Sequence, residues 1–182
     1  MEFTDFQNVH AMLTTTVQQH RDRPAYRWIT APGQTESVTW GEFDAQVRQV
    51  GKGLMALDVE LGDKVNIVSY SCYRWVLTDM AVMSIGAVTV GIYQSNLPKD
   101  CRYIIDHSDA VVVFAQDNQQ LDKLFEIRAE IPDVRKVILF SGEAPEDDWV
   151  MGYEDFLASG ESVSDQAFDE RCRAAKPQDP AL

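Results

Sequence analysis

The first 60 positions carry apolar spacings typical of a helix and then of two short strands. Apolar side chains share one face of a helix at residues 8–19, namely Val9, Met12, Leu13 and Val17. Residues 25–29 and 37–40 then have the character of strands, and the Pro32-Gly33 pair between them is typical of a turn. This pattern predicts a helix followed by a β-hairpin.

The clearest helix signal follows the hairpin. Thr39 and Glu42 have the spacing of a capping box, in which two side chains satisfy backbone groups at a helix start. Apolar residues then recur every three or four positions, which places them on one buried face. They are Phe43, Val47, Val50, Leu54 and Leu57. Gly62 and Asp63 mark the turn that ends this unit.

Beyond residue 61, short β-branched runs alternate with helical segments. The strand candidates are residues 65–69, 88–92, 111–115 and 137–140. The gaps between them hold helix candidates at residues 75–85, 99–106 and 121–130. Apolar strands separated by helices favour parallel pairing, right-handed crossovers and helices on both faces of the sheet. We therefore predict an α/β fold with a largely parallel sheet, preceded by a helix and a β-hairpin.

These patterns divide the chain into three regions. Residues 1–60 form the helix, hairpin and helix lead-in, and residues 61–142 form the alternating β/α sheet domain. Residues 143–182 are acidic and lose the periodicity, apart from a short helix predicted at residues 153–157. We expect this last region to be an irregular segment and connector.

Charge narrows the range of partners. The chain has 29 acidic residues against 16 Lys and Arg, and its formal net charge is -13. Such a chain repels nucleic-acid phosphates and anionic lipid, so we expect neither as a partner. Many of the acids lie between residues 141 and 170, with no Lys or Arg among them. A solvated surface explains this run, and a basic partner or a metal site is the alternative.

Cysteine content and hydropathy indicate the compartment. Cys72, Cys101 and Cys172 are too few and too widely spaced for a disulfide framework, which favours a reducing environment. The nearly uncharged stretch at residues 75–93 contains Asp79, and a central Asp costs about 3 kcal/mol on bilayer insertion. A buried helix and a buried strand explain the same residues without that cost. We predict a cytoplasmic protein without a transmembrane segment.

Few residues suggest chemistry. Ligands of parallel sheets bind beyond the carboxyl ends of the strands. The polar loops there begin at Ser69-Tyr70-Ser71, Tyr93-Gln94-Ser95-Asn96, Gln116-Asp117-Asn118 and Ser141-Gly142. Gly51-Lys52-Gly53 lies inside the capped helix and lacks the phosphate-loop pattern. Since the histidines and cysteines are isolated and no nucleophile elbow occurs, we predict no catalytic and no metal-binding residue.

A series of motifs along the chain carries a family resemblance. They are Val38-Thr-Trp-Gly-Glu-Phe, Leu61-Gly-Asp-Lys-Val-Asn-Ile-Val-Ser, Trp75 with Thr78-Asp-Met-Ala and Gly86-Ala-Val-Thr-Val, Gly91-Ile-Tyr-Gln-Ser-Asn, and Tyr103-Ile-Ile-Asp-His-Ser-Asp-Ala-Val-Val-Val-Phe. In this order they resemble the adenylate-forming family of acyl-CoA synthetases, luciferases and peptide-synthetase adenylation domains. The Gly-Ile-Tyr turn is similar to a Pro-Ile-Tyr-Pro-Thr turn of long-chain members, which favours a fatty-acid substrate.

The chain departs from the family pattern at five loop positions. Ser71, Tyr73 and Arg74 stand where family members often have Asn, Pro and Glu before the tryptophan. Gly91 and Gln94 replace the two prolines of the turn. The packing positions around them are kept.

The resemblance implies the amino-terminal portion of the adenylate-forming enzyme fold. For a full-length parent it implies ATP-dependent fatty-acid–CoA ligation, in which an acyl-adenylate forms first and acyl-CoA second. ATP, Mg and CoA would act in that parent, whose other partners are the fatty acid, the rest of the polypeptide and, as in some relatives, a second copy in a homodimer. The substrate-cleft candidates are Ser71, Tyr93, Gln94 and Ser95.

The family's Ser/Thr/Gly-rich phosphate loop, which ends in Pro-Lys-Gly, does not occur in this sequence. We therefore expect this portion to be inactive alone and to bind no cofactor by itself. Two alternatives stay open. One is a different adenylate-forming enzyme, acting on amino acids or aryl acids, and the other is a non-enzymatic scaffold or interaction module.

Overall fold

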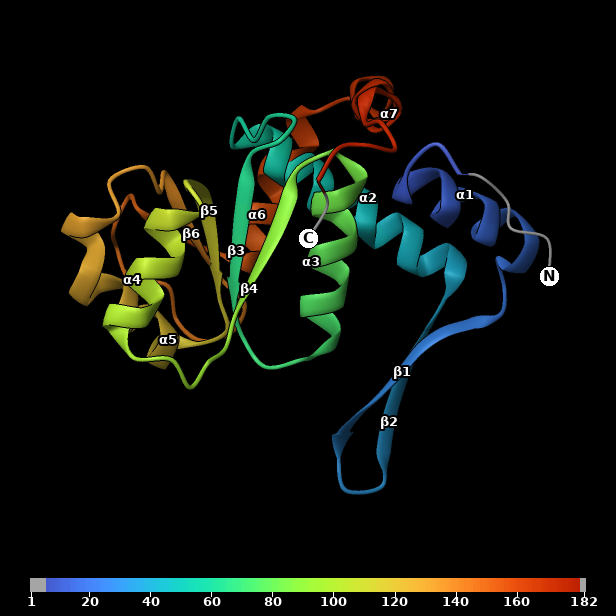
Figure 1. Cartoon of the computed structure of the whole chain (residues 1–182). Helices are drawn as coiled ribbons and strands as arrows, with labels where there is room; N and C mark the ends of the chain where they lie inside the picture. The colour runs from blue at the N-terminus through green and yellow to red at the C-terminus, as the bar shows by residue number, and fades with distance from the viewer. Residues whose placement is uncertain (1–5, 181–182) are drawn as a thin grey trace.

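The computed structural model describes residues 6–180, and its first elements are a helix and a projecting hairpin (Figure 1). Helix α1 (Val9–His20) is capped by the preceding residue, Asn8, whose side chain accepts a hydrogen bond from the backbone N–H of Ala11 at 2.9 Å. Strands β1 (Pro24–Ala31) and β2 (Gln34–Thr39) pair antiparallel. Gly33 has a φ of +78°, a conformation that glycine adopts without strain, in the turn between them. The predicted helix and hairpin are confirmed.

Helix α2 (Trp40–Ala56) starts with the predicted capping box. The backbone N–H of Glu42 donates to the Thr39 hydroxyl at 3.2 Å, and the backbone N–H of Thr39 donates to the Glu42 carboxylate at 2.7 Å. The predicted apolar face of α2 is buried in the core from Phe43 to Leu54. Aromatic contacts hold the hairpin to α2 and to helix α3 (Tyr73–Ser84). The Tyr26 ring lies 4.7 Å from that of Phe43, and the Trp28 ring stacks on Tyr73, with 4.2 Å between centroids.

The centre of the molecule is a five-stranded parallel sheet. Its strands are β3 (Lys64–Val68), β4 (Val88–Ile92), β5 (Ala110–Ala115), β6 (Lys136–Leu139) and β7 (Val150–Gly152). They lie in the order β4-β3-β5-β6-β7, and every neighbouring pair is parallel. The crossover helices are α3 (Tyr73–Ser84), α4 (Pro98–His107) and α5 (Asn118–Ile127). The predicted α/β fold is confirmed.

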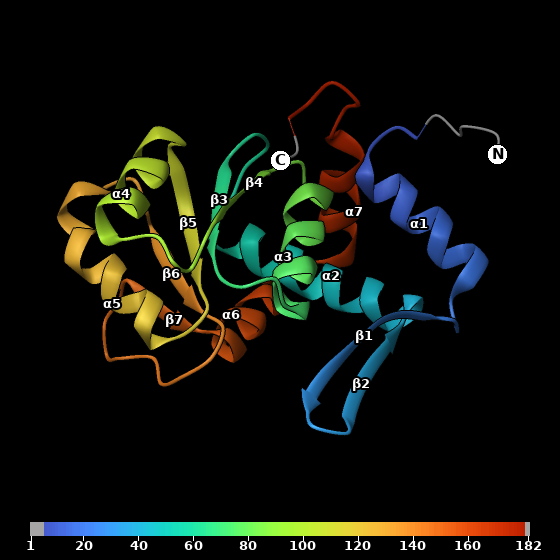
Figure 2. The same cartoon turned by 60° about the horizontal axis from the view of Figure 1, so that its bottom comes forward.

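Helices cover both faces of the sheet, which therefore has two cores (Figures 1 and 2). Alternate residues of a strand point to opposite faces. Val112 and Phe114 of β5 belong to the core under α2, α3, α6 (Tyr153–Ser159) and α7 (Asp165–Ala174), whereas Val113 and Ala115 belong to the core under α4 and α5. Because both faces are covered, the strands of this sheet are largely apolar on both sides, and an alternation of apolar and polar residues is hard to see in them.

The carboxyl-terminal region differs from the prediction. Residues 143–182 were expected to be irregular apart from one short helix, but they contain β7, helix α6 (Tyr153–Ser159), a 3-10 turn (Gly160–Ser162) and helix α7 (Asp165–Ala174). Phe156 and Phe168 are fully buried in the core beside α2. The dense acidic residues, most of them exposed, mask a sparse apolar face made by Phe168, Cys172 and Ala175.

Two glycines of α2 allow α6 and α7 to approach closely. A β-carbon on Gly51 would lie 2.5 Å from the Phe168 ring, and one on Gly53 would lie 2.7 Å from the Phe156 ring. The Gly51-Lys52-Gly53 sequence thus has a packing function. Within residues 6–180, no helix is both long enough and apolar enough to cross a membrane.

Candidate substrate cleft

The loops after β3 and β4 form a cleft at the carboxyl edge of the sheet. Its volume is about 510 Å³. The residues that line it are Ser69, Tyr70, Ser71, Trp75, Gly91, Ile92, Tyr93 and Gln94. Because the two strands are parallel neighbours, their carboxyl ends meet at the same edge.

The structure brings three of the four predicted site residues together. Ser71, Tyr93 and Gln94 line the cleft, whereas Ser95 is exposed in the turn beyond it and does not line it. Trp75 was placed on a helix by the sequence, and its contribution to the cleft was missed. Its position in the first turn of α3, next to a strand-end loop, is the signal that points to the cleft.

Gly91 keeps the Trp75 ring uncovered on one side of the cleft. A β-carbon on Gly91 would lie 3.5 Å from Cζ2 of Trp75, which is an ordinary contact distance. A larger side chain at this position would therefore lie against the ring and reduce the space beside it. Gly91 therefore leaves this part of the cleft open.

A half-buried glutamine, Gln116, fixes the loop after β3. The Gln116 side-chain oxygen accepts hydrogen bonds from the Ser69 hydroxyl at 2.9 Å and from the backbone N–H of Tyr70 at 2.6 Å. Gln116 follows β5. From β3 the chain adds β4 on one side, and then crosses to the other side to add β5, so the order of the strands switches between β3 and β5. The side chain bridges this switch point, where open α/β sheets commonly bind ligands.

Lys123 of α5 fixes the loop after β4. Its ammonium group donates to the carbonyl oxygens of Gln94 and Asn96 at 2.5 and 2.9 Å, and to the Gln120 side-chain oxygen at 2.9 Å. All three donors of the lysine are therefore used within the molecule. No local sequence pattern points to Lys123, because its contacts with Gln94 and Asn96 join positions far apart in the chain.

The chemistry of the cleft is aromatic and uncharged. Tyr70 and Tyr93 are 54% and 77% exposed, and no residue that lines the cleft is acidic or basic. Hydroxyl and amide groups supply hydrogen bonds, and Trp75 supplies an apolar wall. The cleft can accommodate an apolar or uncharged part of a ligand, but it offers no general base and no cation for a phosphate. Within residues 6–180, no group of three or more His, Cys, Asp and Glu side chains is arranged to hold a metal ion.

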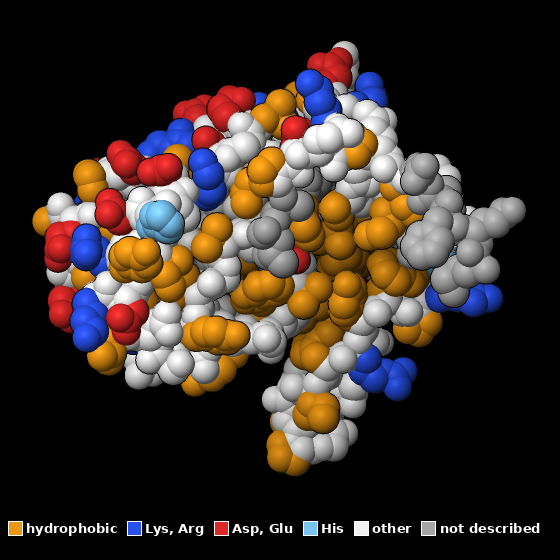
Figure 3. All heavy atoms as spheres, viewed as in Figure 1, with side chains coloured by type: hydrophobic (Ala, Val, Ile, Leu, Met, Phe, Trp, Pro, Cys, Tyr) orange, Lys and Arg blue, Asp and Glu red, His pale blue; other side chains and the backbone are white. Residues whose placement is uncertain are grey.

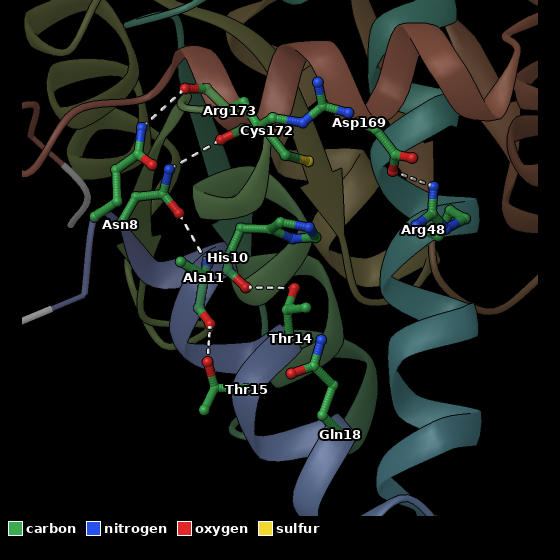
Figure 4. Close-up of a pocket in the computed structure, with 11 residues that line it drawn as sticks. Asn8, His10, Ala11, Thr14, Thr15, Gln18, Arg48, Asp169, Cys172 and Arg173 are labelled. Atoms are coloured by element: carbon green, nitrogen blue, oxygen red, sulfur yellow. Dashed lines mark hydrogen bonds and ion pairs between the residues drawn. The ribbon is translucent and has the colours of Figure 1, made fainter. Parts of the chain in front are cut away.

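A second cavity, of about 470 Å³, lies between α1, α2 and α7 (Figure 4). The Asn8 amide donates to the carbonyl oxygens of Cys172 and Ala175, both at 2.9 Å, and Arg48 pairs with Asp169 at 2.8 Å. Burial lowers the pKa of His10 in this cavity from its ordinary value. The hydrogen bonds from Asn8 to the α7 backbone and the Arg48–Asp169 ion pair therefore join α1 and α2 to α7.

Comparison with known proteins places the fold and the motifs in one family. The sequence profile of AMP-binding enzymes matches residues 13–182. Long-chain-fatty-acid–CoA ligase FadD15 of Mycobacterium tuberculosis is 32% identical over 178 residues, which are 96% of this chain and 28% of that protein. Long-chain-fatty-acid–CoA ligase ACSBG1 of Bos taurus is 26% identical over 93% of this chain and 23% of its own length.

Solved structures show the same fold. Anthranilate CoA ligase AuaEII, in complex with anthranoyl-AMP, superposes with a TM-score of 0.70 and 19% identity over 100% of this chain and 31% of that chain. The N-terminal domain of FACL13 from Mycobacterium tuberculosis has a TM-score of 0.66 at 19% identity, over 97% of this chain and 38% of that domain. The chain thus spans less than a third of the FadD15 and ACSBG1 ligases and corresponds to the amino-terminal part of such enzymes. It belongs to the family of AMP-binding enzymes.

Proposed function

We propose that this chain is the amino-terminal portion of an ATP-dependent long-chain fatty-acid–CoA ligase. The observation that carries the proposal is the 32% identity with FadD15 over 96% of the chain. In the complete enzyme, the fatty-acid carboxylate would attack the α-phosphorus of ATP, giving acyl-adenylate and pyrophosphate. The CoA thiol would then attack the acyl carbon and release AMP.

In this proposal, the cleft after β3 and β4 forms one wall of the substrate site. Ser71, Tyr93 and Gln94 line it, and Ser95 lies next to it in the turn. The aromatic, uncharged lining supports contact with an uncharged part of a substrate. It does not fit the triphosphate or Mg, because phosphoryl transfer needs cations and backbone donors around the phosphorus. Those groups would come from the rest of the polypeptide.

The compartment and assembly belong to the same proposal. We propose a cytoplasmic enzyme, because the three cysteines are free and Cys101 and Cys172 are buried as thiols. A homodimer, which the family resemblance implies for some relatives, stays a prediction.

The test is ATP–pyrophosphate exchange by the complete ligase and by the 182-residue chain. The complete ligase should exchange with palmitate and not with anthranilate or amino acids, and the chain alone should be silent. If the complete ligase instead exchanged faster with an aryl acid or an amino acid, the fatty-acid assignment would be wrong, and the alternative, an aryl-acid or amino-acid adenylating enzyme, would hold. Exchange by the chain alone would contradict the predicted dependence on the rest of the polypeptide.

A matched pair of variants tests the cleft. Tyr93→Ala removes an exposed ring that lines the cleft, and Tyr103→Ala removes a ring that is 59% exposed on α4, outside it. Burying an aromatic side chain against a ligand is worth about 1.5–3 kcal/mol, so kcat/KM for Tyr93→Ala should fall about tenfold or more. Equal kcat/KM values for the two variants would exclude the cleft from the substrate site.

A further inference from the structure

A third cavity, of about 340 Å³, is lined by residues of α2, α3 and α6. Helix α2 packs against both α3 and α6, and Figure 2 shows the three helices gathered beside the sheet. None of the residues that line this cavity belongs to the substrate cleft. Its volume is within the range of about 300–1,000 Å³ that is typical of small-molecule sites, so it is a separate candidate for ligand binding.

The hydroxyl of Tyr153, a residue that lines this cavity, has no hydrogen-bond partner. Tyr153 is 7% exposed, and its hydroxyl oxygen is buried and forms no hydrogen bond within residues 6–180. Burial raises the pKa of this hydroxyl to about 12, so it keeps its proton at neutral pH and remains a donor. Since native proteins rarely leave a buried hydroxyl without a partner, its acceptor is expected to come from a bound molecule.

Arg74 brings a positive charge to the same cavity. Its guanidinium group lies 4.5 Å from the centroid of the Tyr153 ring. Within residues 6–180, no Asp or Glu forms an ion pair with Arg74. Contact with the face of a ring engages the charge of the guanidinium group but does not use its N–H donors. Arg74 is therefore available to a negatively charged ligand.

Amide and apolar groups complete the lining. The Tyr73 hydroxyl donates to the Gln46 side-chain oxygen at 2.9 Å, which leaves the two N–H donors of that amide for another partner. Val50 and Leu77 supply an apolar wall. No Asp or Glu among the described residues lines the cavity. A cation, neutral donors and an apolar wall together fit an organic anion.

The surroundings limit the charge of that anion. The net charge of the chain is -13, and Figure 3 shows Asp and Glu side chains spread over the top and left of one face of the molecule. Glu154, which directly follows Tyr153, is exposed on α6. This negative field repels a polyphosphate, whose several charges a single guanidinium group does not neutralise. One carboxylate matches one guanidinium group in charge and in hydrogen bonding.

We propose that this cavity, the Arg74–Tyr153 site, binds a small organic monocarboxylate with an apolar body. The carboxylate pairs with Arg74 and accepts a hydrogen bond from the Tyr153 hydroxyl, and the body lies against Val50 and Leu77. Because Arg74 lies over the Tyr153 ring, a turn of the guanidinium group toward the anion opens the way to the hydroxyl. The inference goes beyond the proposed function and does not depend on it, since the site lies within the 182-residue chain.

Titration calorimetry of the 182-residue chain with benzoate tests the site. We expect one saturable site with a Kd of about 1 mM or lower. Benzamide has the same shape without the charge and should bind at least about tenfold more weakly, and so should inorganic phosphate. Octanoate distinguishes an aliphatic body from an aromatic one, and saturable binding of either carboxylate supports the proposal.

Variants locate the bound carboxylate. Arg74→Gln should raise the Kd by about tenfold or more, and Tyr153→Phe by about three- to tenfold. Arg102→Gln is the control, because Arg102 lies on α4 and pairs with Asp106 and Glu130, and its Kd should stay within about twofold of the parent value.

Thermal unfolding separates a lost ligand contact from a damaged fold. Without ligand, Tyr153→Phe should keep the Tm of the parent or exceed it, because the removed hydroxyl has no partner. Benzoate at about ten times its Kd should raise the Tm of the parent by about 3–6 °C, and that of Arg74→Gln by less than half as much. A lower Tm for Tyr153→Phe without ligand would show that the hydroxyl already has a partner, and it would overturn the site.

The remaining outcomes are equally decisive. Absence of saturable heat up to about 10 mM of both carboxylates would overturn the proposal. Equal affinity for benzamide, or an unchanged Kd in Arg74→Gln, would do the same. A complete ligase that catalyses ATP–pyrophosphate exchange but binds benzoate no differently after Arg74→Gln would overturn the site and leave the proposed function standing. Binding that depends on Arg74 in a ligase without exchange activity would do the reverse.

Discussion

The close packing of α2 against α6 predicts that Gly53→Ala destabilises the chain. In an ordinary helix interior, alanine is more favourable than glycine by about 1 kcal/mol. Gly53 lies inside α2, so helix propensity alone predicts that the variant is more stable. The tertiary structure predicts the opposite sign.

The magnitude follows from the contacts of the added β-carbon. That atom would lie 2.7 Å from two atoms of the Phe156 ring and 3.0 Å from the Phe156 carbonyl oxygen. Phe156 is fully buried and packs edge-on against Phe114 at 5.4 Å between centroids, so its ring has little room to move. Overpacking costs about 1–3 kcal/mol, and since the ring has little room to move, we expect the upper part of this range, about 2–3 kcal/mol, against a propensity gain of about 1 kcal/mol. We expect the free energy of unfolding to fall by about 1–2 kcal/mol.

Urea unfolding followed by tryptophan fluorescence measures this change as a shift of the midpoint at constant slope. Ala45→Gly, on the exposed face of the same helix, calibrates the propensity term and should cost about 1 kcal/mol. In a Phe156→Leu background the penalty of Gly53→Ala should shrink or reverse. A Gly53→Ala chain more stable than the parent would refute the close approach of α6 and α2.

Three further predictions concern the loop, a histidine and a thiol. Lys123→Met should destabilise the chain by about 1.5–3 kcal/mol and speed hydrogen exchange in the β4–α4 loop, whereas Lys99→Met, at an exposed site, should do neither. Burial lowers the pKa of His10 below 6.5, so its contribution to stability is full above that pH and is lost as pH falls through the lowered pKa. The loss of stability from pH 7 to pH 5 should be smaller in His10→Gln, and equal losses would contradict the assignment. Burial raises the pKa of Cys172 to about 12, so iodoacetamide at pH 8 should label the partly buried Cys72 well before Cys172, and equal rates would argue against the packing of α7.

Local patterns in the sequence determined most of the elements. The capping box of Thr39 and Glu42 marked the start of α2, and the Pro32-Gly33 pair marked the hairpin turn. These signals act over one or two turns of chain, so they can be interpreted without the tertiary structure. The alternation of apolar strands with helices was enough to predict parallel pairing. Parallel pairing in turn placed Ser71 and Tyr93 at one edge of the sheet.

Only the tertiary structure decided which distant residues meet. Gln116 and Lys123 fix the cleft loops through contacts between separate strands and helices. No local sequence pattern predicts these contacts. Phe156 and Phe168 enter the core because α2 offers glycines at the matching positions. Side-chain direction in the β4–α4 turn separated Gln94, which lines the cleft, from the exposed Ser95. Local sequence sets backbone preference, whereas burial depends on which surfaces of the folded chain come together, and that is a property of the whole molecule.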